Sequence, residues 1–386
     1  MKRHIFGILL GLLACLGLIS LRLSDPPVMA SLRASGFDTL QRLWPRASPP
    51  QPVRVVAIDE AALAKLGQWP WPRDRLATLV ENLTSLGAQA IVFDILFAEP
   101  DRSSPSQLVQ DPAVKAMLST QPGQDLPDHD KAFAAAIAKA PVVLAASALP
   151  AASATGPQPK AGFAVTGQEV QTGLPVMEGL VGNLPALDAA ARGLGVINID
   201  LAGNGGVVRA LPLLWRGGEK PFPSLALEAL RVAQGQQTVV VNGSPTLAGA
   251  VNSIRVGQIE IPTAEQGALA VYYHHDDPNL YVSAAQLLDP SQLASLRPLI
   301  EGHIVLVGAT ATGLLDTRVS SLGESLPGVA VHAQALEQVL SGQFLSRPEW
   351  VADFEMVLVA AAGLAFSILA GLWRPLPLIG ALLATL

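Results

Sequence analysis

Residues 53–97 contain the sequences VRVVAID (53–59), RLATLVENLTSLGA (75–88) and AIVFDILF (90–97). The first and third are short apolar runs, which is typical of strands buried on both faces, and the middle sequence has helical periodicity. A strand, a helix and a second strand in this order predict a right-handed parallel crossover unit. Residues 131–147 repeat the pattern, with an expected helix at 131–140 and an expected strand at 141–147.

The rest of the central sequence continues the same alternation. We expect a buried strand at 302–309, helices at 223–235 and 329–342, and short antiparallel strands within 238–273. The dipeptide Asn204-Gly205 predicts a hairpin turn between strands at 195–199 and 207–213. Together these elements predict an α/β fold with a mixed sheet.

Composition narrows the class of protein. Of the 386 residues, 50% are hydrophobic and 15% charged, against about 25% charged in a typical soluble domain. The net charge of −6 provides no basic surface for a nucleic-acid backbone, so we expect no nucleic-acid partner. Cys15 is the only cysteine, so an intrachain disulfide or a cysteine-based metal centre is excluded. We expect no cofactor.

The apolar excess is concentrated at the two ends of the chain. Residues 1–24 are expected to form an N-terminal transmembrane anchor and residues 351–374 a second transmembrane helix, with the bilayer as a partner. Lys2, Arg3 and Arg374 flank these segments, which places both flanks in the cytoplasm and residues 25–350 outside. Residues 375–386 resemble the start of a further membrane helix that is truncated.

Two short polar motifs carry the side-chain types of a metal site. Asp128-His129-Asp130 precedes an expected helix, and we interpret it as a helix cap. His274-His275-Asp276-Asp277 lies before Pro278, and adjacent side chains on a strand point to opposite faces. We therefore predict no metal at either motif.

A group of carboxylates lies at or beyond the ends of the predicted strands. Ligands in open α/β sheets bind outside the carboxyl ends of strands, so such a group is suited to a cation or a polar ligand. The alternative is that the carboxylates cap helices and turns, with Arg73 paired to one of them. The carboxylates are Asp59, Asp94, Glu99, Asp101 and Asp316.

The loop Trp69-Pro-Trp71-Pro-Arg73 completes the set of candidate ligand-binding residues. Its prolines stiffen the backbone, and Arg73 presents a planar fork that fits a carboxylate. The loop is suited either to holding a ligand between two indoles, or to plugging the end of the sheet while Arg73 pairs with Asp59 or Asp94.

The same residues carry a resemblance that covers about residues 28–345. The chain resembles the CHASE2 extracellular sensory domain of bacterial receptors. The matching blocks are Ile58-Asp59, Gly67-Gln-Trp69-Pro-Trp71-Pro-Arg73, Phe93-Asp94-Ile-Leu-Phe97-Ala-Glu99-Pro-Asp101, Gly206-Val-Val-Arg209, Pro223-Ser-Leu-Ala-Leu-Glu228, Val305-Leu-Val-Gly308-Ala-Thr310 and Pro327-Gly-Val-Ala-Val-His332.

The resemblance implies a multi-pass receptor of the bacterial cell membrane, with a periplasmic or extracellular sensor at residues 25–350 and a C-terminal cytoplasmic effector. Such effectors are class III adenylate or guanylate cyclases, histidine kinases or Ser/Thr kinases, and a homodimer is expected. The stimulus is not named by the resemblance, and no enzyme activity is expected within these residues. Two alternatives stay open: an anchored metal-dependent hydrolase that uses Asp59, Asp94 and Glu99, and a structural envelope protein without a ligand.

Overall fold

The computed structural model describes residues 11, 13, 15–20, 24, 26–47, 52–109, 126–151, 156–199, 206–218, 220–314, 317–345 and 350–372. The chain divides into two compact units. One comprises Met1–Thr39 with Arg347–Leu386, and the other comprises Leu40–Ser346.

A seven-stranded sheet forms the centre of the Leu40–Ser346 unit, and it confirms the expected α/β fold with a mixed sheet. Every pair of neighbours along it is parallel except β3 with β5. The order is β15 (Tyr281–Ser283), β1 (Val53–Ile58), β16 (Ile304–Ala309), β2 (Ala90–Phe93) and β3 (Val142–Leu149), with both β5 (Gly179–Val181) and β6 (Gly193–Val196) against β3. β16 therefore separates the two strands of the first predicted crossover unit.

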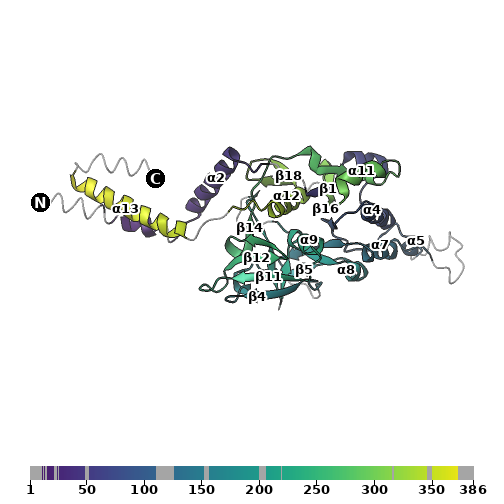
Figure 1. The fold of residues 1–386 in the computed structure, drawn as a ribbon, viewed down its shortest axis with the longest axis horizontal. Helices are drawn as coiled ribbons and strands as arrows, with labels where there is room; N and C mark the ends of the chain where they lie inside the picture. Colours follow the sequence, from purple (N-terminus) through teal and green to yellow (C-terminus); the bar gives the residue numbers. More distant parts are fainter. Residues whose placement is uncertain are drawn as a thin grey trace. The chain divides into compact units, whose positions relative to one another are not determined.

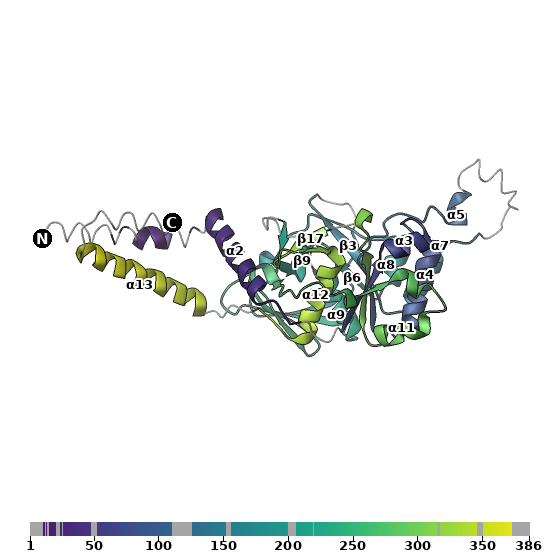
Figure 2. The ribbon, with the colours of Figure 1, turned by 90° about the horizontal axis from the view of Figure 1, so that it is seen from above.

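Hydrophobic side chains cover both faces of this sheet. Alternation along a strand sends Val55 and Val92 into one core and Val56 and Phe93 into the other. In Figure 2, strands β3 and β6 lie between the α9–α12 pair and the helices α3, α4, α8 and α11. The helices of this unit are α3 (Glu60–Leu66), α4 (Arg73–Ser85), α5 (Pro105–Leu108), α7 (His129–Ala138), α8 (Pro185–Ala190), α9 (Leu225–Ala233), α10 (Ala284–Leu287), α11 (Leu293–Ile300) and α12 (Gly328–Ser341).

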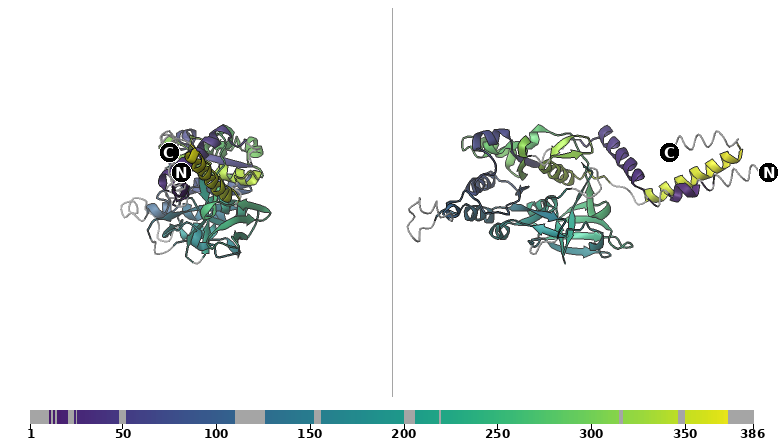
Figure 3. Two further views of the ribbon diagram at one scale, coloured as in Figure 1. Left: turned by 90° about the vertical axis from the view of Figure 1, so that its left-hand side faces the viewer. Right: turned by 180° about the vertical axis from the view of Figure 1, so that it is seen from behind.

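Smaller sheets complete this unit (Figures 1 and 3). One has four strands in the order β13 (Ile259–Pro262), β12 (Val251–Val256), β11 (Thr238–Gly243) and β4 (Gly162–Thr166), with β4 parallel to β11. The others pair β9 (Leu214–Gly217) with β10 (Lys220–Pro223), β8 (Ala210–Pro212) with β14 (Ala268–Ala270), and β17 (Thr317–Ser320) with both β18 (Ser325–Pro327) and β7 (Val207–Val208). Single-turn helices are η1 (Gln171–Gly173), η2 (Glu265–Gly267), η3 (Pro278–Leu280) and η4 (Thr312–Leu314).

The predicted hairpin around residues 195–213 is wrong. β6 belongs to the main sheet, whereas β7 pairs with β17 and β8 pairs with β14. Tertiary pairing partners therefore override the local turn preference of Asn204-Gly205, which itself lies outside the described residues.

Helix α12 is the most deeply enclosed helix of the described chain. Every residue from 328 to 339 is buried, against β1, β16 and α9. The helix ends where Gly342 adopts a left-handed conformation with φ of 67°, a conformation that favours glycine. Residues 343–349 then lead to α13 (Trp350–Leu372).

The other unit contains α13, part of α2 (Pro27–Leu43) and helical residues between 11 and 20. The side chain of Cys15 occupies the space where a Cβ on Gly363 would lie, so the glycine lets the two helices approach closely. No helix among the described residues has the length and apolar character that crossing a bilayer requires. Residues 375–386 and most of residues 1–24 lie outside the described residues.

Candidate functional site

The two tryptophans of the 67–73 loop pack against the end of the main sheet. Trp71 is buried, and its indole Nε1 donates a hydrogen bond to the carbonyl of Gly67 at 2.8 Å. The ring of Trp69 meets that of Trp71 edge-on, with the centroids 5.3 Å apart. Both belong to the hydrophobic cluster that contains Ile58 and Phe93, the last residues of β1 and β2. The loop therefore forms a packed aromatic plug, and ligand binding by its indoles stays a prediction.

Arg73 begins α4 and pairs with Asp130 on α7. Its Nε lies 3.5 Å from Asp130 Oδ1, and its guanidinium carbon lies 4.4 Å from the centre of the Phe97 ring. Burial lowers the pKa of Arg73, although the neighbouring Asp130 and Asp101 oppose that shift. The expectation that Arg73 pairs with Asp59 or Asp94 is wrong. Because β2 and β3 are adjacent parallel strands, the first turn of α7, which precedes β3, lies beside the loop that follows β2.

Asp101 is the hub of the polar network around Arg73. Its Oδ2 accepts the backbone N–H of Arg73 at 2.8 Å, and its Oδ1 accepts both the backbone N–H and the hydroxyl of Ser103, at 2.8 and 2.6 Å. Its own N–H donates to Asp130 Oδ2 at 2.9 Å. Burial alone would raise the pKa of Asp101, but the hydrogen bonds from Ser103, Arg73 and His129 outweigh it, so this pKa lies below its usual value. Asp101 is therefore a fixed anion.

His129 carries this network to the surface. Its Nδ1 lies 3.1 Å from Asp101 Oδ2, and because Asp101 is an anion, Nδ1 is the nitrogen that donates. Its Nε2 lies 3.9 Å from Asp74 Oδ2. A cleft of about 460 Å³ opens here, lined by Leu66, Pro72, Asp74, Arg75, Thr78, Ser103, His129 and Leu288. Charged, hydroxyl and apolar groups thus converge on a space suited to a small polar molecule.

The other candidate carboxylates that the structure describes have separate partners. Asp59 caps α3 by accepting the N–H of Ala62 at 2.8 Å, and it accepts the hydroxyl of Ser283 at the same distance. Asp94 is half-buried directly after β2, and its N–H donates to Val307 of β16. Glu99 is exposed and pairs with Arg102 at 2.8 Å. Asp316 lies outside the described residues.

Two histidines of the second polar motif point to different partners. His274 Nε2 lies 2.7 Å from Glu337 Oε2 in the interior, while His275 Nδ1 lies 2.6 Å from Glu324 Oε1 in an exposed pair. Asp277 caps η3 through the N–H of Asn279. Among the described residues, no three histidine, cysteine or carboxylate side chains gather as a metal site would need.

Four residues of this network and its cleft are absent from the candidate site residues that the sequence predicts: Asp74, Ser103, His129 and Asp130. Asp128 is the N-cap of α7, as the capping interpretation predicts. Of the next two residues, His129 contacts Asp101 and Asp130 pairs with Arg73. One available signal was that each of these polar residues lies in a loop or a first helical turn that follows a predicted strand, and so comes to the carboxyl-end edge of the sheet.

The comparison with protein families identifies the family of the chain. The family model described as "CHASE2 domain" matches residues 10–372, nearly the whole chain. No curated protein and no solved structure matches the chain significantly. The match extends over the main sheet, the aromatic plug and the Arg73 network. The chain therefore belongs to the CHASE2 family of sensory domains.

Proposed function

We propose that the chain is the sensory input and membrane portion of a bacterial transmembrane receptor. Residues 25–350 would lie in the periplasm or outside the cell. Residues 1–24 and 351–374 would cross the membrane, and residues 375–386 would begin a further crossing. The sensory role follows from membership of the CHASE2 family. The proposed orientation in the membrane rests on the basic residues Lys2, Arg3 and Arg374, which flank the two apolar segments.

The observation that carries the proposal is the course of the chain after the sheet. Helix α12 packs on β1 and β16, and β1 ends at Ile58 in the hydrophobic cluster of the aromatic plug. After α12 ends at Gly342, the chain runs through residues 343–349 to the apolar helix α13. A shift in the sheet-end loops that moves α12 would therefore reach α13, a segment that we place in the membrane, through a short stretch of chain.

The cleft beside His129 is the proposed site of the stimulus. Asp74 and Arg75 supply opposite charges at its wall, and Leu66 and Leu288 supply apolar surface. A small polar molecule that bound there would shift the population between two arrangements of the loops that hold Arg73 and Asp101. The effector would be a class III adenylate or guanylate cyclase, or otherwise a histidine or Ser/Thr kinase, and the receptor would act as a homodimer.

Topology fusions test the membrane part of the proposal. Alkaline phosphatase fused after position 160 should be active, and the same enzyme fused after Arg374 should be inactive. Fusions of a fluorescent protein that folds only in the cytoplasm provide the matched control and should give the opposite pattern. Activity of both phosphatase fusions, or of only the second, would overturn the arrangement.

A second experiment tests signalling. The complete receptor is expressed in cells without their own cyclase, and cyclic nucleotide is measured for the wild type and for Gly308→Ala. A Cβ at Gly308 would press on Val329 of α12, so the variant should change output. Gly313→Ala has open space around its Cβ and should leave output unchanged. Equal output from all three proteins would contradict the route through α12.

A further inference from the structure

Residues 270–274 form an extended ribbon that is held along both edges by glutamine side chains. On one edge, Gln41 donates from Nε2 to the carbonyl of Val271 at 2.9 Å and accepts the N–H of Tyr273 at 3.0 Å. This side chain pairs with alternate backbone groups as a neighbouring strand would. Gln41 lies near the end of α2, where the chain enters the Leu40–Ser346 unit.

Helix α12 holds the opposite edge. Gln338 donates to the carbonyl of Ala270 and accepts the N–H of Tyr272, both at 2.9 Å. Gln334 accepts the N–H of His274 at 3.2 Å. The two glutamines are one helical turn apart and therefore share a face of α12. Both are fully buried.

Arg46 crosses from the entering segment to the helix. Its backbone N–H donates to the carbonyl of Tyr273, and its Nε donates to the carbonyl of Tyr272 at 2.8 Å. Its Nη2 donates to the carbonyl of Gln334 at 3.2 Å. The same Nη2 lies 3.7 Å from Glu337 Oε2, and neither of these side chains is exposed. A guanidinium in this position joins the two edges without passing through solvent.

His274 closes the arrangement at the end of the ribbon. Its Nδ1 donates to the carbonyl of His275 at 2.6 Å, while its Nε2 meets Glu337 Oε2 at 2.7 Å, a hydrogen bond that places one proton between the two groups. Glu337 therefore contacts both His274 at the end of the ribbon and Arg46 of the entering segment.

We propose that the 270–274 ribbon locks the entering segment, residues 41–46, to the departing helix α12, so that the two move as one body. The reason is the cost of separation. Because these amides, carbonyls and charges are buried, releasing either edge alone leaves polar groups without hydrogen bonds, a loss that exceeds that of a solvent-exposed bond. The edges should therefore open together.

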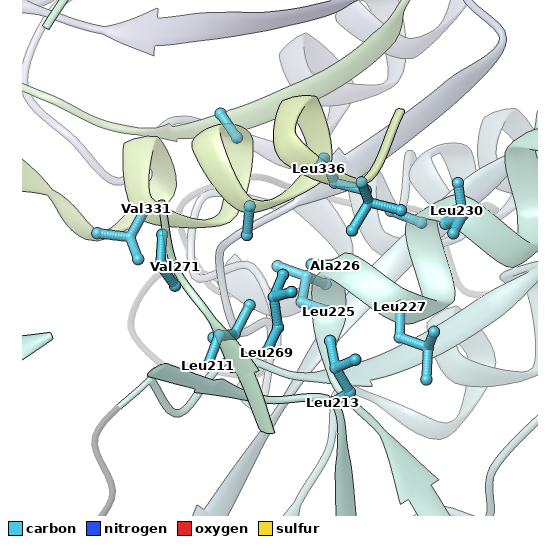
Figure 4. Close-up of a cluster of buried hydrophobic side chains, with 14 of the residues drawn as sticks. Leu211, Leu213, Leu225, Ala226, Leu227, Leu230, Leu269, Val271, Val331 and Leu336 are labelled. Carbon is cyan, nitrogen blue, oxygen red and sulfur yellow. The ribbon is translucent and has the colours of Figure 1, made fainter. Parts of the chain in front are cut away.

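The apolar floor beneath the ribbon supports the same coupling. Figure 4 shows Leu269, just before the ribbon, and Val271, within it, pointing into the cluster that contains Val331 and Leu336 of α12 and Leu227 of α9. A displacement of α12 would thus carry the ribbon with it through packing as well as hydrogen bonds. The use of this coupling to transmit a signal rests on the proposed function; the coupling itself does not.

Hydrogen exchange of the full chain, resolved to single amides by fragmentation mass spectrometry, tests the lock. Each glutamine protects a known amide, so Gln41→Met removes the partner of Tyr273 only, and Gln338→Met removes the partner of Tyr272 only. Coupling predicts that Gln41→Met speeds exchange about tenfold at Tyr272 and His274 as well, and that Gln338→Met does the same at Tyr273. Gln89→Met, which loses a bond to Ala233, is the control and should leave the ribbon unchanged.

Acceleration confined to the amide that lost its partner would overturn the proposal. If Gln41→Met unfolds the unit, Tyr272→Phe provides the milder variant, because it removes only the exposed bond from the tyrosine hydroxyl to the carbonyl of Trp44. This variant should raise exchange at Tyr273 and His274 together by a smaller factor. A change at one of them alone, or at neither, would also contradict the lock. The topology fusions are independent of every one of these outcomes.

Discussion

Arg73 and Asp130 form an ion pair that solvent hardly reaches: Nε and Oδ1 lie 3.5 Å apart, and the two side chains are only 11% and 13% exposed. The pair joins the start of α4 to the start of α7 above the ring of Phe97. Its two members are the chain neighbours of Asp74 and His129, which line the cleft.

Breaking this pair should destabilise the protein strongly. Asp130→Ala leaves the guanidinium buried without its partner and should lower the free energy of unfolding by about 3 kcal/mol or more. Urea unfolding of the full chain measures the loss. Arg102→Ala removes a pair that is 89% and 73% exposed, and it serves as the control because it should cause no measurable change. Equal stability of the two variants would show that the Arg73 pair contributes nothing.

The lowered pKa of Asp101 predicts a specific loss of stability in acid. A carboxyl whose pKa is lower in the folded than in the unfolded protein stabilises the fold above its unfolded pKa, about 3.9. That contribution is lost as the pH falls through the folded pKa. Ser103→Ala removes a 2.6 Å hydrogen bond that lowers the pKa of Asp101, so the folded pKa should lie closer to the unfolded one and the variant should lose less stability on acidification than the wild type.

Unfolding midpoints between pH 2 and pH 7 provide the measurement, with the pH range chosen around the usual aspartate pKa of about 3.9. In an Asp101→Asn background, Ser103→Ala should no longer alter the pH profile, because the titrating group is gone. A shift that persisted in that background would assign the acid sensitivity to another carboxyl.

Packing at Gly308 should limit which side chains this position tolerates. A Cβ there would lie 2.6 Å from the Cβ of Val329 on α12. Gly308→Ala should therefore cost about 1–3 kcal/mol of stability through overpacking. Adding Val329→Ala should recover part of the loss, since the two residues share one space. Strictly additive losses in urea unfolding would refute the contact.

The contact between Cys15 and Gly363 makes the thiol a reporter of helix pairing. Gly363→Leu fills the space that the Cys15 side chain occupies, so it should expose the thiol and raise its rate of maleimide labelling several-fold. A Cβ at Gly17 has open space around it, so in Gly17→Leu the Cys15 thiol should be labelled at the wild-type rate. Unchanged labelling of Gly363→Leu would mean that the two helices do not pack at this point.

The local elements follow from the sequence more readily than their arrangement. The buried runs at 53–59, 90–97, 141–147 and 302–309 correspond to β1, β2, β3 and β16, because fully buried strands need continuous apolar side chains. Their order in the sheet depends on contacts between distant parts of the chain, and so the position of β16 between β1 and β2 had no local signal.

The candidate site shows the same division. Arg73 and Asp101 are recognisable as unusual charges at the ends of strands, yet the partner of Arg73 is decided by which helix lies beside the loop after β2. His129 and Asp130 have the composition of an ordinary cap. Their roles emerge only when β2 and β3 are known to be neighbours.

The position of β16 also has a consequence in time. The ribosome releases β1 and β2 well before residues 304–309, which must enter between them. Until then the facing edges of β1 and β2 lack their final partner, and unpaired strand edges are a common starting point for aggregation. The nascent chain therefore cannot complete its main sheet until almost the whole Leu40–Ser346 unit has been made.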